Sequence, residues 1–248
     1  MLLLLGISSL ISLAAALVLG IRLLRLAAHT RGVPELAMGA SFLLGGFLGF
    51  LFILIGNPAA GVALPVPVTE MLFRLGMSLI SVGLCFTYIF VWQTFRPGSS
   101  SVRGLTLTAI VCILASLWAV WSATIEEALV SPLYLFGEAV RMGGMVWGCI
   151  EALHYHVVMR RRLALGLADP VVTNRFLLWG IAMGAGIITA LTGLCMTLFG
   201  MTEMVGLGAW PYLVLGIFAT ISPVAQWFAF FPPRGYCEWV QGSAVEAS

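Results

Sequence analysis

Apolar runs of about 20 residues without a charged side chain recur along this chain, and they limit it to folds that cross a lipid bilayer. The first extends from Leu2 to Gly20 and the second from Leu36 to Gly56, and four more follow. Each run is long enough for one transmembrane helix, because a helix rises about 1.5 Å per residue and the hydrocarbon core is about 30 Å thick. The pattern therefore predicts a chain that crosses the membrane several times.

The composition excludes a soluble globular protein. The chain of 248 residues is 61% hydrophobic and only 9% charged, whereas a soluble domain carries about 25% charged residues. A soluble fold of this length also needs polar residues to cover its outside. We therefore expect an integral membrane protein, and the bias toward Arg, Ala, Gly and Leu favours the cytoplasmic (inner) membrane of a bacterium.

The apolar runs predict an all-α membrane protein with a single domain of seven transmembrane helices over residues 1–233. Six helices come from the charge-free runs, and the fifth helix in the chain, which begins at Pro132, carries charged residues. Residues 234–248 are expected to form a short interfacial, disordered cytoplasmic tail. The approximate spans are 2–27, 35–56, 68–95, 103–125, 132–160, 170–201 and 205–232.

The arginines indicate which side of the membrane each connection occupies. All twelve basic residues are arginines. Successive connections between membrane helices lie on opposite sides of the bilayer, and ten of the arginines fall in or next to the connections of one side. Since cytoplasmic loops carry the excess of basic residues, the N-terminus is expected outside and the C-terminus in the cytoplasm. These ten are Arg22, Arg25, Arg31, Arg96, Arg103, Arg160, Arg161, Arg162, Arg175 and Arg234.

The longest basic connection, MRRRLALGLADP, has clear helix-terminating and helix-starting residues. Gly166 suits the left-handed conformation that ends a helix. Asp169 and Pro170 suit the N-cap and first position of the next helix. Four arginines flank this connection and are expected to bind anionic lipid headgroups or a cytoplasmic partner. They are Arg160, Arg161, Arg162 and Arg175.

Several functional classes lack the residues that they need. A retinal Schiff base requires a lysine amine, and the chain has none. A net charge of +2 without a basic run that includes aromatic residues argues against a nucleic-acid partner. The five cysteines stand singly, without a metal-binding or disulfide pattern. No hydrolase motif is present, so the sequence gives no basis for calling the chain an enzyme.

One histidine segment, EALHYH, has part of the ligand pattern of a metal or haem site. Glu151 and His154 have the Glu-x-x-His spacing of di-iron helical bundles, and His156 lies close by. Such sites need a second motif and further carboxylates, and the sequence offers neither. No cofactor is therefore expected, and the histidines are interpreted as interfacial residues.

A second polar cluster is expected near the outer face. Charged residues inside membrane helices are costly and often functional, and two arginines here run against the positive-inside trend. Either the cluster binds an anionic or zwitterionic ligand, because the guanidinium fork suits carboxylates and phosphates, or it is a set of structural ion pairs. The residues are Asn57, Glu70, Arg74, Glu138 and Arg141.

These features favour a receptor or sensor that binds an anionic or lipid-like ligand in an outer polar cavity and signals to a partner. The alternatives are a small-solute transporter or channel and an accessory subunit of a larger membrane complex. Under the first interpretation, Arg141→Ala lowers ligand-dependent output while folding survives. The GxxxG pair Gly144 and Gly148 is expected to let helices approach closely, within the chain or, alternatively, in a homodimer.

Overall fold

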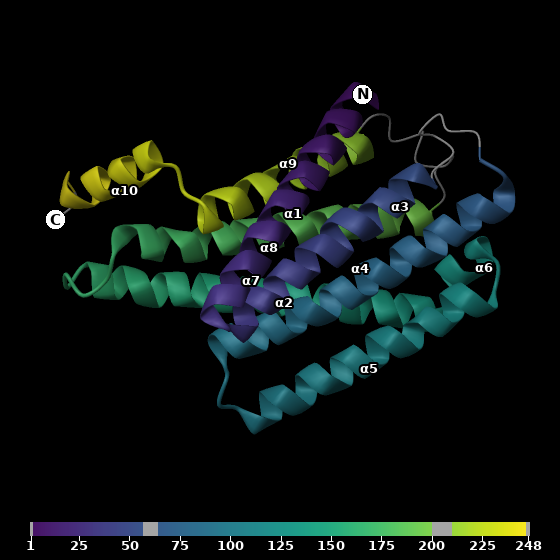
Figure 1. Ribbon diagram of the computed structural model, residues 1–248, viewed down its shortest axis with the longest axis horizontal. Helices are drawn as coiled ribbons and strands as arrows, with labels where there is room; N and C mark the ends of the chain where they lie inside the picture. The colour runs from purple at the N-terminus through teal and green to yellow at the C-terminus, as the bar shows by residue number, and fades with distance from the viewer. Residues whose placement is uncertain (1, 57–63, 200–209, 247–248) are drawn as a thin grey trace.

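The computed structural model describes residues 2–56, 64–199 and 210–246, and it is helical over nearly all of this part of the chain (Figure 1). Asn57 lies outside the described residues. The elements are α1 (Leu2–Thr30), α2 (Val33–Ser41), the π-helix η1 (Phe42–Gly49), α3 (Phe50–Ile55), α4 (Val66–Phe95), α5 (Ser100–Ser122), α6 (Ile125–Val130), α7 (Pro132–Leu163), α8 (Pro170–Leu198), α9 (Trp210–Phe230) and α10 (Arg234–Glu246).

Six helices of the described chain are long and apolar enough to cross a bilayer. They are α1, the continuous rod formed by α2, η1 and α3, then α4, α5, α8 and α9. The remaining long helix, α7, has 32 residues, carries several charges and is not in this group. The structure thus supports an α-helical membrane protein with six candidate spans, and a seventh span through α7 stays a prediction.

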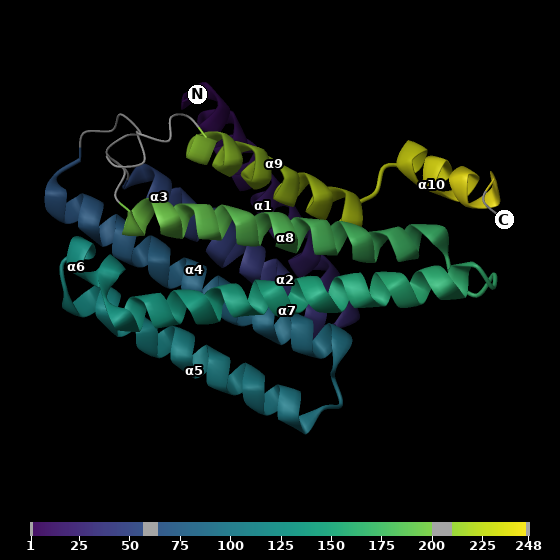
Figure 2. The same ribbon diagram turned by 180° about the vertical axis from the view of Figure 1, so that it is seen from behind.

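The long helices form a closed ring. Around it, α1 packs on α2, the rod of α2, η1 and α3 packs on α4, α4 on α7, α7 on α8, α8 on α9, and α9 on α1. Helix α5 stands outside this ring, against α4 and α7, as the two opposite views show (Figures 1 and 2). Six rods therefore enclose an interior, and α5 covers part of the outside.

Glycines allow three of these contacts to be very close. A Cβ atom added to Gly83 of α4 would lie 2.8 Å from the Cα of Gly45 in η1. In α7, a Cβ at Gly144 would lie 2.6 Å from the ring of Tyr88, and one at Gly148 would lie 2.4 Å from the sulfur of Met183. The close packing expected from the GxxxG pair is confirmed within the chain, and the homodimer stays untested.

The connections rich in arginine gather at one end of the bundle. The α1–α2, α4–α5, α7–α8 and α9–α10 connections lie on the left side of Figure 1, and we call this the arginine-rich end. It carries the ten arginines of these connections. One of them, Arg22, has its guanidinium carbon 4.8 Å from the ring centre of Phe231 and 5.7 Å from that of Trp227. The cytoplasmic placement of this end stays a prediction.

The α7–α8 connection has the predicted caps. Gly166 has a φ of +67°, and the Leu167 N–H donates to the Arg162 carbonyl at 2.9 Å. The Asp169 carboxylate accepts from the N–H groups of Val171 and Val172 at 2.7 and 3.0 Å, with Pro170 as the first residue of α8. Local sequence therefore fixes where α7 ends and α8 begins.

We expect Asp169→Ala to loosen the start of α8. Loss of an N-cap costs about 1 kcal/mol, so amide hydrogen exchange at Val171 and Val172 should quicken roughly fivefold. Asp169→Asn is the control, because its side-chain oxygen still accepts these bonds. Equal exchange rates in the alanine and asparagine variants would contradict a capping role.

The segment after α9 is a helix through Glu246 rather than a disordered tail. Helix α10 packs against α8, where the Asn174 side-chain amide donates to the Tyr236 hydroxyl. The Tyr236 ring lies 5.1 Å from that of Phe228, and burial raises the pKa of its hydroxyl. Trp239 is 66% exposed, which suits an interfacial anchor.

Candidate functional site

A cavity of about 460 Å³ lies inside the ring of helices. Its walls come from α1, the α2–η1–α3 rod, α4, α7, α8 and α9, with no lining residue from α5 among those described. Most of the wall is apolar, and polar side chains stand at intervals on every helix of the ring. These are Ser12, Ser41, Thr87, Glu138, Arg141, Thr189, Ser222 and Gln226.

Two of the lining helices depart from regular α-helix at the cavity. The rod containing α2 becomes a π-helix at Phe42–Gly49, a feature that is frequent at functional sites. In α9, Pro223 has no N–H, so the carbonyl of Ala219, four residues earlier, loses its helical donor. The Ser12 hydroxyl of α1 donates to this carbonyl at 2.9 Å. The irregular backbone is therefore supported by a neighbouring helix.

Most of the cavity hydroxyls donate their single hydrogen bond to a backbone carbonyl. Besides the bond from Ser12, Ser222 donates to Ala182 at 2.9 Å and Thr189 donates to its own helix at 3.0 Å. Ser41 and Thr87 share a hydrogen bond of 2.8 Å. Each of these oxygens keeps lone pairs that can accept a further hydrogen bond.

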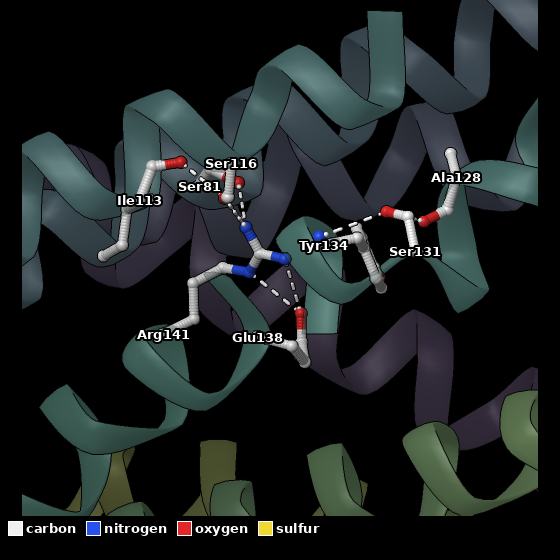
Figure 3. A network of polar contacts seen from close by, with 8 residues as sticks. All are labelled: Ser81, Ile113, Ser116, Ala128, Ser131, Tyr134, Glu138 and Arg141. Atoms are coloured by element: carbon white, nitrogen blue, oxygen red, sulfur yellow. Dashed lines mark hydrogen bonds and ion pairs between the residues drawn. The ribbon is translucent and has the colours of Figure 1, made fainter. Parts of the chain in front are cut away.

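Arg141 and Glu138 form a buried ion pair at the cavity wall (Figure 3). The Arg141 Nε donates to Glu138 Oε2 at 2.8 Å. Its Nη1 donates to the hydroxyls of Ser81 in α4 and Ser116 in α5, at 3.3 and 3.1 Å. The guanidinium also lies 5.2 Å from the ring centre of Tyr134. Arg141 thus joins α4, α5 and α7, with its side chain only 2% exposed.

The second predicted pair lies elsewhere. Glu70 and Arg74 form an i,i+4 contact of 3.5 Å on α4. Arg74 also donates to the carbonyls of Trp121 and Ala123, at 3.1 and 3.0 Å, so it caps the end of α5. Neither Glu70 nor Arg74 is among the described residues that line the cavity. The structure therefore divides the predicted outer cluster into a cavity pair and a helix-capping pair.

Glu151 has a structural partner that sequence reasoning missed. Arg96, at the end of α4, donates to both carboxylate oxygens at 3.0 and 3.4 Å, and Trp147 donates to one of them at 3.3 Å. This carboxylate raises the pKa of Arg96 through its hydrogen bonds and its charge. The pair joins the arginine-rich ends of α4 and α7.

The two histidines of this segment have protein partners rather than a shared ligand. The His156 Nδ1 lies 2.9 Å from the carbonyl oxygen of Thr173, and the His154 ring packs at 6.1 Å from that of Tyr155. Among the described residues, no three His, Cys, Asp or Glu side chains are grouped to hold a metal ion. Among these residues, Glu151 therefore lacks the companion ligands that a di-iron site needs.

The arginines of the α7–α8 connection are all exposed. Arg160, Arg161 and Arg162 lie in the last turn of α7, and Arg175 lies in the second turn of α8. No ion pair to an acidic side chain is found for them in the described residues. Their charges are therefore open to phosphate or carboxylate groups of another molecule.

An aromatic cluster closes the bundle between the cavity and the arginine-rich end. Trp179 has its ring centre 5.1 Å from Phe90, 5.4 Å from Phe230 and 6.2 Å from Phe95. Phe42 packs edge-on to Phe230 at 6.2 Å. Phe42 lines the cavity as well, so it belongs to both structures.

No family model, curated protein or solved structure matches the chain. The cavity, its polar residues and the two ends of the bundle are the features of this chain that bear on function.

Proposed function

We propose that this chain is a seven-helix membrane receptor that binds a small amphipathic, lipid-like molecule in the central cavity. The observation that carries the proposal is a mid-bundle cavity with polar side chains on each of six surrounding rods, closed on one side by aromatic rings. A volume of about 460 Å³ suits a small molecule, since ligand sites commonly span about 300–1,000 Å³.

The mainly apolar wall supports a ligand with a hydrocarbon body and one polar end. Arg141 was expected to attract an anion, but its Nε and Nη1 atoms donate to Glu138, Ser81 and Ser116, and its Nη2 lies 2.8 Å from the Glu138 carboxylate. A bound anion would have to compete with the Glu138 carboxylate for the same guanidinium. The proposal therefore keeps the lipid-like ligand and does not carry the anionic one forward.

Coupling would run through the aromatic cluster. Phe42 belongs both to the cavity wall and to this cluster, and Met183 of the cavity wall lies in the same hydrophobic core. That core reaches Trp227 and Phe231, and the Phe231 ring lies against Arg22. A ligand that moves Phe42 or Met183 changes the packing at the arginine-rich end, because packed cores shift between discrete arrangements. There the exposed arginines would meet anionic lipid headgroups or a cytoplasmic partner, with this end facing the cytoplasm of a bacterial inner membrane.

A transporter is the second candidate, because helix breaks next to a mid-bundle cavity are also found in transporters. The π-helix η1 and Pro223 supply such breaks. Counterflow of a radiolabelled short-chain amphiphile in proteoliposomes separates the two. Flux above that of protein-free liposomes supports transport, and binding without flux supports the receptor.

Filling the cavity should remove ligand binding. Gly186 lines the cavity, and a Cβ atom there meets only the Met145 sulfur, at 3.4 Å. Gly186→Leu therefore places a side chain in the cavity without striking backbone. We expect labelling by a diazirine-bearing octanol to fall about tenfold, the equivalent of about 1.4 kcal/mol of binding free energy.

The matched control is Gly193→Leu on the same helix, because nothing lies within 4 Å of a Cβ atom at Gly193. Labelled peptides are identified by mass spectrometry of protein in lipid nanodiscs. Gly193→Leu should label like the unmodified chain. Equal labelling of the Gly186→Leu and Gly193→Leu proteins would refute a ligand site in the cavity.

A further inference from the structure

The geometry of the wall points to the charge of the ligand, and we propose that the cavity selects a molecule whose polar end donates hydrogen bonds, an amine or ammonium group, with Glu138 as its counter-charge. This inference rests on the proposed function and names the ligand class. It reverses the preference for anions that the arginines suggest in the sequence.

Three hydroxyls of the cavity wall use their protons in bonds to backbone carbonyls. Ser12, Thr189 and Ser222 donate to backbone carbonyls at distances of 2.9 to 3.0 Å. A hydroxyl has one proton and two acceptor lone pairs. These three residues come from α1, α8 and α9, so acceptors face the cavity from several sides.

The Arg141 guanidinium points away from the cavity, toward α5. The Arg141 guanidinium reaches Ser81 and, on α5, Ser116, and α5 contributes no lining residue to the described cavity. Its remaining nitrogen, Nη2, is buried and lies 2.8 Å from Glu138 Oε2, without the alignment of a hydrogen bond. The donor nitrogen without a hydrogen bond is therefore buried against the carboxylate that neutralises the guanidinium.

The carboxylate is the accessible member of the pair. The Glu138 side chain is 17% exposed against 2% for Arg141. Its Oε2 holds the arginine, and its Oε1 has no hydrogen-bond partner in the described part of the chain. Figure 3 shows the guanidinium held from one side by Glu138 and from the other by Ser81 and Ser116.

The remaining polar group does not reverse this preference. Gln226 lines the cavity, and its amide offers a donor and an acceptor alike. No cation without a carboxylate partner is found among the described lining residues. An anion would therefore meet lone pairs and a carboxylate, whereas an ammonium would meet acceptors and would share the Glu138 carboxylate with Arg141.

The test uses three eight-carbon competitors that differ only at the polar end. Octylammonium, octanol and octanoate compete with the diazirine-bearing octanol in nanodiscs of zwitterionic lipid, so the bilayer adds no net surface charge. Displacement is plotted against the concentration of each competitor measured in the membrane. We expect octylammonium to displace the probe at about tenfold lower concentration than octanol, as a charged hydrogen bond predicts, and octanoate to be the weakest.

Glu138→Gln should remove the advantage of octylammonium over octanol while the octanol probe still labels the cavity. Because this substitution leaves the buried guanidinium unpaired, the double variant Glu138→Gln with Arg141→Met is measured beside it. Ser222→Ala removes one acceptor and should reduce the advantage only in part.

Preferred displacement by octanoate, with labelling still lost in Gly186→Leu, would overturn the choice of an amine and leave the cavity as a ligand site. An unchanged advantage of octylammonium in both Glu138 variants would also overturn it. Labelling that Gly186→Leu leaves intact would instead overturn the proposed function.

Discussion

Replacing Arg141 with alanine is expected to lower the free energy of unfolding by about 3–5 kcal/mol, because it removes one partner of a buried ion pair. The guanidinium holds α4, α5 and α7 together through Ser81, Ser116 and Glu138. Its loss leaves a carboxylate and two hydroxyls without these partners, together with a hole the size of the side chain.

A double-mutant cycle separates the loss of the pair from the loss of packing. Arg141→Met keeps most of the side-chain volume, and Glu138→Leu removes the charge that would remain. Because an apolar pair of similar volume often replaces a buried ion pair without loss, the double variant should recover most of the stability that Arg141→Met loses. Reversible unfolding in mixed micelles, followed by circular dichroism, measures each variant.

This expectation differs from the one that the sequence suggests, in which folding survives and only the ligand response falls. An Arg141→Ala protein as stable as the unmodified chain would mean that the guanidinium does not tie the helices together. The functional interpretation of Arg141 would then return, with the arginine free to meet an anion.

The sequence predicts the positions of the helices along the chain better than the contacts between them. Six apolar runs and the caps at Gly166 and Asp169 depend on local chemistry, so their positions follow from composition and turn geometry. The fifth predicted span illustrates the limit. Helix α7 begins at Pro132 as expected. Whether it can cross the membrane depends on which side chains of neighbouring helices pair with its charged residues, and the sequence does not show these partners.

Side-chain partners could not be predicted, because they depend on which helices touch. Arg74 was grouped with Glu138, whereas it contacts carbonyls at the end of α5. For Glu151, the sequence offers no second carboxylate that could share a metal ion, and Arg96 was not recognised as its ion-pair partner. Both residues fall at span ends on the same predicted side, and that placement was a usable signal.

The cavity itself had only indirect signals in the sequence. Pro223 frees the carbonyl of Ala219, but nothing in the sequence links that carbonyl to Ser12, 207 positions earlier. The π-helix gave only a pair of adjacent glycines in FLLGGFLG as a sign. Both features depend on long-range packing, which local propensity does not determine.

Gly83→Ala is expected to cost about 1–3 kcal/mol, as overpacking in a tight core does, and Gly83→Val more. A Cβ atom at this position would lie 2.8 Å from the Cα and N atoms of Gly45 and 3.1 Å from the Ser41 carbonyl oxygen. These are backbone atoms, so no side chain can rotate away and α4 must move from the rod. Unfolding in mixed micelles again measures the change.

The control is Gly104→Ala in α5, where nothing lies within 4 Å of the added atom. Because alanine favours the helix over glycine, this substitution should raise the free energy of unfolding by up to about 1 kcal/mol. Gly45 and Gly83 both line the cavity. Separation of their helices therefore widens the ligand site, and Gly83→Ala should weaken probe labelling as well as the fold. If Gly83→Ala matched Gly104→Ala in both measurements, α4 and η1 would not approach as closely as this wall of the cavity requires.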